Sequence, residues 1–168
     1  MEKYWKSSDL EDLEKAKTFE ELADIAIRVI KRMPQPVVQV CGPMTTGGKS
    51  FKENMEFFEN SIKFLRIKGF SVFNQIAFEE AMHRIVKSDY PPVYCRELLE
   101  IFYGKILRSG LIKKTFFLPK WWGSRGAIWE RMVSIHERIE ILPFPQDWVS
   151  KINLWRTEAA LGFLTFIC

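Results

Sequence analysis

Cysteine is scarce in this chain of 168 residues, and its three copies are far apart. Cys41, Cys95 and Cys168 form no Cys-x-x-Cys pair, and no histidine stands at a metal-ligand spacing from them. An odd, scattered set of this kind gives neither a disulfide framework nor a zinc site. We therefore expect reduced thiols in a cytoplasmic protein that holds no metal.

Long apolar runs and a strong excess of one charge are also missing. The most apolar end, "AALGFLTFIC", is shorter than the roughly 18 residues of a membrane span, and we expect a docked helix or an oligomer contact there. The opening "MEKYWKSSDLEDLEK" is charged, unlike a signal peptide. The net charge of +4 comes from basic residues scattered among acidic ones. These absences argue against a membrane or a nucleic acid as partner.

The composition itself is that of a folded chain. Hydrophobic residues make up 47%, charged residues 27% and aromatic residues 14%, which argues against disorder. There is neither an internal repeat nor a low-complexity linker. We expect a single domain over 1–168, with a helical extension at 1–34, an α/β core at 37–145 and a last helix at 147–164 within the segment 147–168.

Apolar periodicity divides the chain into alternating helices and strands. Capping boxes at Thr18 with Glu21 and at Ser50 with Glu53 mark two helix starts, and Ser124 and Asp147 are expected to cap two more. The short apolar runs lack polar alternation, which is typical of strands covered on both faces. We expect helices over 18–33, 50–69, 78–86, 93–107, 124–138 and 147–164, and strands over 37–41, 70–74, 115–119 and 139–145.

This alternation predicts an α/β fold with a parallel sheet of about four to five strands, helices on both faces, and added N-terminal and C-terminal helices. Strand 37–41 is expected at the centre, with 70–74 on one side and 115–119 on the other. In such sheets ligands bind beyond the carboxyl ends of the strands. That rule selects the loops 42–49, 74–80 and 120–125.

The first of these loops, "CGPMTTGGKSF", resembles a phosphate-binding P-loop but has the wrong spacing. Gly48-Lys49-Ser50 supplies the second half of that motif, whereas the first glycine would have to stand where Pro43 does. The turn can still hold a phosphate or a sugar through backbone N–H groups and the hydroxyls of Thr45 and Thr46. The alternative is that its glycines only form a tight turn.

The third loop, in "LPKWWGSRGAIWE", carries a second candidate group. Ser124 caps the following helix, Gly126 opens its first turn, and Glu130 lies on the same helical face. A carboxylate in this place is suited to attack an anomeric carbon, and Trp121 and Trp122 could wall a planar base. The alternatives are that Glu130 is a solvated helix residue and that the tryptophans only pack.

With these pieces the chain resembles the nucleoside 2-deoxyribosyltransferase-like superfamily. The resemblance spans about residues 37–142 and is carried by "VCGPMTTGG", "FKENMEFFENSIKFLRIKGFSVFN" and "FLPKWWGSRGAIWE". It implies a flavodoxin-like or Rossmann-like sheet, cleavage or exchange of an N-glycosidic bond, no cofactor, a small-molecule nucleoside or nucleotide as ligand, and a homodimer or larger homo-oligomer.

Carried over by position, the resemblance makes Glu130 the nucleophile, and Ser124 and Gly126 the groups that hold a 5′-phosphate or the sugar. The turn Gly42–Thr46 would line the sugar site. Together with the strand-end rule, this predicts that the substrate-binding residues converge on one cleft. They are Gly42, Pro43, Met44, Thr45, Thr46, Asn74, Gln75, Trp121, Ser124 and Gly126.

One departure from the superfamily pattern distinguishes between the possible functions. The superfamily often has an Asp at the start of the strand before Leu-Pro, where this chain has Lys113 and Lys114. That Asp helps to bind or protonate the base, and Glu79 or Glu80 are candidates to replace it. An N-glycosyl transferase or hydrolase is the leading interpretation. A nucleotide-binding module without turnover and a structural partner in a larger assembly are the alternatives.

Overall fold

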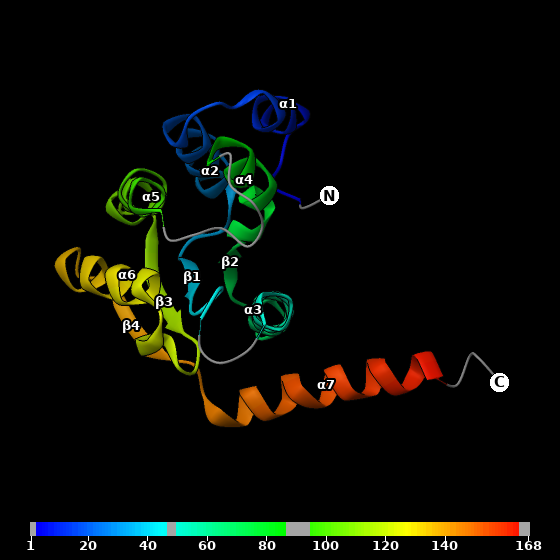
Figure 1. Cartoon of the computed structure of the whole chain (residues 1–168). Coiled ribbons are helices and arrows are strands. Elements are labelled where there is room, and N and C mark those ends of the chain that lie inside the picture. Colours follow the sequence, from blue (N-terminus) through cyan, green and yellow to red (C-terminus); the bar gives the residue numbers. More distant parts are fainter. Residues whose placement is uncertain (1–2, 47–49, 87–94, 165–168) are drawn as a thin grey trace.

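A four-stranded, all-parallel sheet with the strand order β2-β1-β3-β4 forms the centre of the molecule (Figure 1). The computed structural model describes residues 3–46, 50–86 and 95–164. The elements are α1 (Ser7–Lys15), α2 (Phe19–Arg32), β1 (Val37–Cys41), α3 (Phe51–Ile67), β2 (Ser71–Phe73), η1 (Gln75–Phe78), α4 (Glu79–Val86), the π-helix η2 (Leu98–Tyr103), α5 (Gly104–Arg108), β3 (Ile112–Phe117), η3 (Trp121–Gly123), α6 (Arg125–His136), β4 (Glu140–Pro143) and α7 (Gln146–Leu164).

The strand order confirms the expected α/β fold of the flavodoxin and Rossmann kind. The chain moves from β1 to β2 on one side, then returns across β1 to β3 and continues to β4. Val38 pairs with Val72 of β2, and Gln39 pairs with Thr115 of β3. The direction of winding therefore reverses between β1 and β3, and such a switch point leaves a crevice at the carboxyl ends of the two strands.

Helices cover both faces of the sheet, as the apolar strands require. Val38 and Val40 of β1 face α3 and the first turns of α7. The alternate residue Val37 faces α2 and α5, and Cys41 packs against α6. Figure 1 shows α7 leaving the body of the molecule after this contact. Within the described residues, no helix is both long enough and apolar enough to cross a membrane.

The predicted helix starts at Thr18, Ser50 and Ser124 are confirmed, because each side chain accepts a hydrogen bond from the N–H three residues on. The predicted strand 115–119 is wrong at both ends, since β3 covers Ile112–Phe117. Its start was missed because two lysines stand there. Lys113 is exposed, and Lys114 forms an ion pair with Glu140 on β4 at 2.8 Å.

Most other boundaries differ by one or two residues. The strands expected at 70–74 and 139–145 are shorter, as β2 and β4. The last helix begins at Gln146, so Asp147 lies in its first turn and does not cap it. The helix expected over 93–107 is divided into η2 and α5, and its first two residues lie outside the described part of the chain.

A buried carboxylate holds α1 against α2. Asp9 is 1% exposed and accepts hydrogen bonds from the backbone N–H of Lys6 at 2.9 Å, from Arg28 at 3.4 Å and from Arg32. Removing one member of a buried polar cluster leaves its partners unsatisfied, which costs more than the net strength of the bonds.

We predict that Asp9→Ala lowers the free energy of unfolding by about 1–3 kcal/mol, because two arginines and one N–H lose a common acceptor. The matched control is Asp12→Ala. Asp12 also pairs with Arg28 but has a half-exposed carboxylate, so its loss should cost at most about 1 kcal/mol. Urea unfolding of both variants measures the difference. Equal losses would contradict the role of Asp9.

Candidate functional site

The carboxyl ends of β1, β2 and β3 open into a cavity of about 520 Å³. Its volume lies in the range of small-molecule sites. The loops after all three strands contribute to it, together with η2 and the first turns of α3 and α6. The lining residues are Gly42, Met44, Thr45, Thr46, Phe51, Phe58, Gln75, Glu79, Cys95, Leu98, Leu99, Tyr103, Gly123, Ser124, Arg125, Gly126, Ala127 and Glu130.

Glu130 lines this pocket from the second turn of α6 and is only 7% exposed. Its Oε1 accepts a hydrogen bond of 3.0 Å from Nε2 of Gln39, which lies on the central strand. The thiol of Cys41, two residues further along the same strand, also hydrogen-bonds its carboxyl group. The interpretation of Glu130 as a solvated helix residue is therefore wrong.

Burial dominates the ionisation of Glu130. It raises the pKa of the carboxyl group to about 8, although the hydrogen bonds from Cys41 and Gln39 act in the opposite direction. Burial, together with the charge of Glu130, also raises the pKa of the Cys41 thiol. The pocket thus holds a carboxyl group that is mostly protonated at pH 7 and has a pKa only about one unit above that pH.

Asn54, a buried residue of α3, holds the turn after β1 in place. Its Nδ2 donates to the carbonyl oxygens of Met44 at 3.0 Å and Thr46 at 2.8 Å. Gly42 passes so close to Leu118 that a Cβ atom on it would lie 2.8 Å from that side chain. The turn therefore has a defined path as far as Thr46, while the residues Gly47–Lys49 of the near-P-loop lie outside the described part of the chain.

The N-terminus of α6 forms a second wall. Ser124 caps the helix by accepting a hydrogen bond of 3.3 Å from the N–H of Ala127. Gly126 follows in the first turn, and a Cβ atom on it would meet only Leu99 and Ser124 at ordinary distances. Arg125 brings a positive charge to the same rim. Helix N-termini favour anions, so this wall is suited to a phosphate or a carboxylate.

The third wall is formed mainly by the segment after β2. It contains Glu79, whose role the sequence analysis did not decide, and Tyr103, which that analysis did not identify. Gln75 donates a 2.7 Å hydrogen bond to the carbonyl oxygen of Val40. Glu79, the first residue of α4, lines the pocket, whereas Glu80 is exposed. Tyr103 comes from η2. A polar residue inside an apolar strand was the one signal for Gln39, and no local pattern marked Tyr103.

The pocket brings together eight of the eleven residues expected at the site. Pro43, Asn74 and Trp121 lie outside its lining. Pro43 borders a separate small hollow beside Leu118, and Asn74 uses its side chain to cap η1 by accepting from Ile76 N–H at 3.2 Å. The eight lining residues are Gly42, Met44, Thr45, Thr46, Gln75, Ser124, Gly126 and Glu130.

The expected tryptophan wall is not present. Trp121 packs edge-on against Phe117, with the guanidinium of Arg131 5.1 Å from its ring centre, and Trp122 is exposed. The chain turns through Lys120 in a left-handed conformation (φ 63°) just before them, and neither ring lines the cavity. The apolar wall is formed instead by Phe51, Phe58, Leu98 and Leu99.

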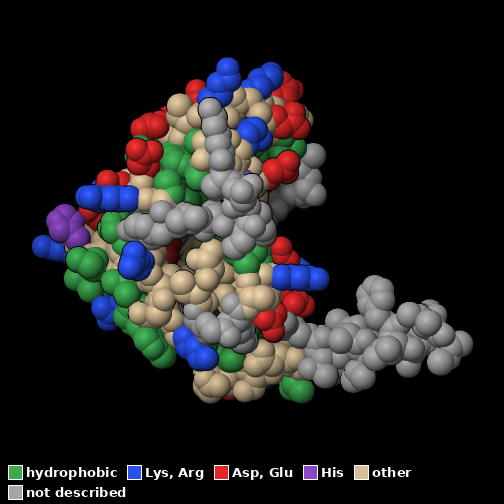
Figure 2. All heavy atoms as spheres, viewed as in Figure 1, with side chains coloured by type: hydrophobic (Ala, Val, Ile, Leu, Met, Phe, Trp, Pro, Cys, Tyr) green, Lys and Arg blue, Asp and Glu red, His purple; other side chains and the backbone are tan. Residues whose placement is uncertain are grey.

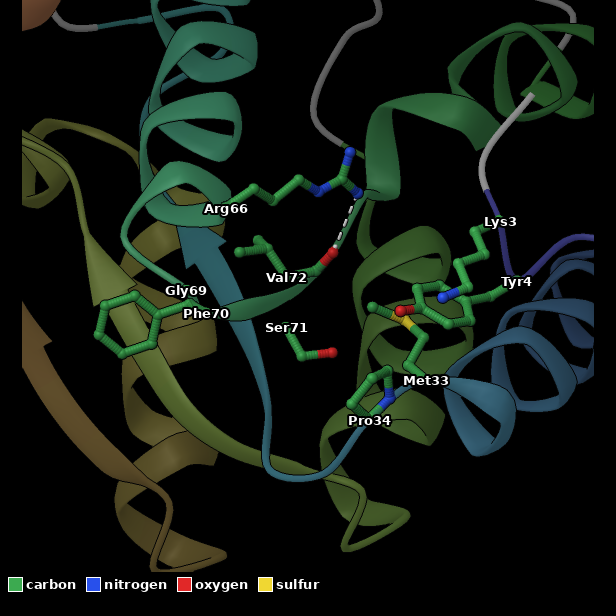
Figure 3. Close-up of a pocket in the computed structure, with 9 residues that line it drawn as sticks. All are labelled: Lys3, Tyr4, Met33, Pro34, Arg66, Gly69, Phe70, Ser71 and Val72. Atoms are coloured by element: carbon green, nitrogen blue, oxygen red, sulfur yellow. Dashed lines mark hydrogen bonds between the residues drawn. The ribbon is translucent and has the colours of Figure 1, made fainter.

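A second cavity, of about 370 Å³, lies at the opposite, amino-terminal end of the sheet (Figure 3). It is bordered by Tyr4, by Met33 before β1 and by Ser71 at the start of β2. Arg66 extends along its edge and donates to the carbonyl oxygen of Val72 at 3.1 Å. None of the described residues that line it carries a carboxylate or a thiol, so of these two cavities the one at the carboxyl ends is the candidate for chemistry.

The described residues contain no group of three His, Cys, Asp or Glu side chains that could hold a metal ion. Comparison with protein-family models, with curated proteins and with solved structures gave no match for the chain. The geometry and the chemistry of the pocket are therefore the basis on which a function is assigned.

The burial of Glu130 makes stability depend on pH. Its pKa is about 8 in the folded protein against about 4.5 in an unfolded chain, so between these values the folded state binds the extra proton. Stability from this group is complete below pH 4.5 and is lost as the pH rises through 8. Since one pKa unit corresponds to about 1.4 kcal/mol, the whole effect amounts to several kcal/mol.

We therefore predict that Glu130→Gln, which copies the protonated side chain, is more stable than the wild type at pH 9 and nearly equal to it at pH 5. Thermal unfolding at pH 5, 7 and 9 measures the difference. Glu140→Gln is the control, because that carboxylate is half exposed. A Glu130→Gln advantage that did not grow with pH would show that the carboxyl group is not held protonated.

Proposed function

We propose that the protein cleaves or transfers the N-glycosidic bond of a nucleoside or a nucleoside monophosphate, with Glu130 as the nucleophile. The observation that carries this proposal is the buried Glu130 carboxyl group in a pocket of about 520 Å³ at the carboxyl ends of the strands. A carboxylate can attack an anomeric carbon and form a glycosyl-enzyme ester. The reaction requires no cofactor.

The walls around Glu130 suit the parts of such a substrate. The N-terminus of α6, with Ser124, Gly126 and Arg125, offers N–H groups and positive charge for a 5′-phosphate. The hydroxyls of Thr45 and Thr46 offer hydrogen bonds to a sugar. The apolar side chains of α3 and η2 offer a surface on which a base can be shielded from water.

The protonated state of Glu130 restricts this chemistry without preventing it. With a pKa of about 8, roughly a tenth of the carboxyl groups are ionised at pH 7. Gln39 and Cys41 both donate to the carboxylate, which stabilises the anion once it forms. Positive charge that develops on the sugar in the transition state stabilises it further, because the attraction is strong in a dry pocket.

A nucleotide-binding module without turnover is the second candidate. Two observations favour it. Glu130 is mostly protonated at pH 7, and neither lysine at the position of the superfamily Asp lines the pocket. Lys113 is exposed and Lys114 is paired with Glu140. A protein of this kind would bind a nucleoside or its monophosphate and release no base.

We further propose that the protein acts as a homodimer through the outer face of α6. Ile128, Met132 and Ile135 are exposed there in one helical stripe, and Met132 is 66% exposed. Figure 2 shows hydrophobic side chains gathered on the side of the molecule where α6 lies. The stripe is uncharged, so two copies of it can pack together about a twofold axis without complementary charges.

For the dimer, we predict that Met132→Glu lowers the molar mass in solution from that of two chains to that of one, because a charge would be buried in an apolar contact. Light scattering after gel filtration gives the mass. Ile67→Glu is the matched control, since Ile67 is 72% exposed on α3 and outside the stripe. A monomeric wild type would exclude the proposed dimer.

For the reaction, we predict that Glu130→Gln abolishes the release of free base from a panel of nucleosides and monophosphates while it leaves binding largely intact. The amide is nearly isosteric but cannot act as an anionic nucleophile, so the rate should fall by several orders of magnitude. Chromatography of the free base and calorimetric binding are the two measurements.

The same panel separates the two candidate functions. A wild type that binds a nucleoside or monophosphate but releases no base supports the binding module and contradicts the enzyme. A wild type that turns over together with an equally active Glu130→Gln variant would show that the nucleophile is another group.

A further inference from the structure

The cavity at the amino-terminal end of the sheet has the size of a ligand site but takes no part in the proposed reaction (Figure 3). Its volume of about 370 Å³ lies within the range of small-molecule pockets. It borders Ser71 at the start of β2, whereas the first cavity lies beyond the end of that strand, at Gln75. The two cavities share no described lining residue and are therefore separate sites.

The N-terminal part of the chain supplies one wall of this cavity. Lys3 and Tyr4 precede α1, and Met33 and Pro34 follow α2. The carbonyl oxygen of Tyr4 accepts a hydrogen bond of 2.9 Å from Nε of Arg32, which ties the segment before α1 to the end of α2. All of these residues precede position 37, where the resemblance to the superfamily begins. The cavity therefore depends on the part of the chain that the resemblance does not cover.

The segment between α3 and β2 supplies another wall. Gly69 has a φ of 88°, a left-handed conformation that glycine adopts without strain, and it turns the chain out of α3. Phe70 then packs edge-on against Phe116 of β3, with the ring centres 5.2 Å apart, and Val72 is buried in the core. The turn and the core thus fix this wall, and its side chains give the cavity an apolar surface.

The charged residues in the described lining are both cations. Lys3 Nζ lies 6.0 Å from the ring centre of Tyr4, and Arg66 extends along the edge of the cavity from the last turn of α3 (Figure 3). The hydrogen bond from Arg66 to the carbonyl oxygen of Val72 holds the guanidinium at this edge. Because none of the described lining residues is acidic, the local potential favours a negatively charged ligand.

A buried hydroxyl group beside the cavity has no partner. Oγ of Ser71 is shielded from solvent and forms no hydrogen bond with the described residues. Figure 3 shows it turned toward Tyr4 and Met33. Buried polar atoms in folded proteins nearly always have a hydrogen-bond partner, so this hydroxyl indicates a bound group. An oxygen atom in the cavity can accept from it once the flexible side chain of Met33 shifts aside.

We propose that this cavity binds a small organic anion, which is a carboxylate or a phosphate monoester on an apolar or aromatic body. The anionic group lies near Lys3 and Arg66 and accepts a hydrogen bond from Ser71. The body lies against the side chains of Met33 and Phe70. Two cations are too few for a nucleic acid or a membrane surface, which need a larger basic patch. The inference does not depend on the proposed N-glycosidic reaction.

Four small probes test the chemistry of the ligand. Benzoate and phenyl phosphate carry an anion on an aromatic ring, benzamide keeps the ring without the charge, and inorganic phosphate keeps the charge without the ring. We expect the full-length protein to bind the first two, and to bind benzamide and inorganic phosphate at least about tenfold more weakly, since each lacks one of the two kinds of contact. Ligand-observed NMR titration at millimolar concentrations measures the affinities. Added salt should weaken the binding of the anions, because both cations are at the surface.

Variants of the lining place the anion. Lys3→Gln and Arg66→Gln should each weaken benzoate binding by about two- to fivefold, as expected for exposed ion pairs, and the double variant by more than either. Ser71→Ala should weaken it by about tenfold or more, because a hydrogen bond to a charged group is lost. The melting temperature of Ser71→Ala without ligand should equal that of the wild type, since the hydroxyl has no partner to lose among the described residues.

Two control variants remove a positive charge elsewhere. Lys63→Gln changes an exposed residue of α3 outside the cavity lining and should leave benzoate binding unchanged. Arg125→Gln removes the cation at the rim of the first cavity, where an anion can also bind, and keeps both cations of the second. It should likewise leave benzoate binding at the second cavity unchanged.

Four results would overturn the proposal. Equal binding of benzamide and benzoate would show that the charge is not recognised, and equal binding of inorganic phosphate and phenyl phosphate would show that the apolar wall is not used. Binding that is lost in Arg125→Gln but kept in the double variant of Lys3 and Arg66 would place the anion in the first cavity. Binding of none of the four probes would leave ordered water as the occupant of the second cavity.

Discussion

The burial of one carboxyl group between the central strand and α6 is the constraint around which the site is built. Glu130 is removed from water by the same packing that closes α6 onto the sheet, and its partners Gln39 and Cys41 belong to the strand at the centre of that sheet. The helix cannot shift along the sheet without breaking this contact. The fold therefore fixes the position of the group and also sets its affinity for protons.

The two faces of helix α6 differ in what they present. Its inner side presents Glu130, and its N-terminus presents Ser124 to the pocket, while its outer side is an exposed apolar stripe. Short polar links hold the other walls at their distances: Asn54 fixes the turn after β1, and Gln75 ties the segment after β2 to β1. Pocket geometry is thus determined by a few hydrogen bonds between loops and by the rigid sheet beneath them.

The parts of the structure that could be predicted from the sequence are those with local causes. Capping boxes, apolar periodicity and strand–helix alternation lie within short segments, and they identified the strand order and most helix starts. The positions of Trp121 and Trp122 could not be predicted, because they depend on the left-handed turn at Lys120. Lys113 and Lys114 concealed the start of β3, since strands near a surface accept charged residues whose side chains reach water.

The candidate site, like the fold, was predictable only where the signal is local in the sequence. Glu130 was identified by its spacing from Ser124, which is a local signal. The burial of Glu79 depends on η2 and on the walls that surround it, far away in the sequence, and so does the raised pKa that follows from it. Tyr103 and Cys41 became part of the site for the same reason. Ionisation in a pocket is a property of the assembled fold, and one segment alone does not determine it.

The proton on Glu130 also couples ligand binding in the pocket to proton release into the solvent. Any ligand that engages the anionic form must first displace that proton, so below pH 8 its affinity falls about tenfold for each unit of acidity. The released proton is taken up by the buffer. The heat of binding measured by calorimetry would then vary with the ionisation enthalpy of the buffer. This holds both for a substrate that reacts and for a ligand that binds without reacting.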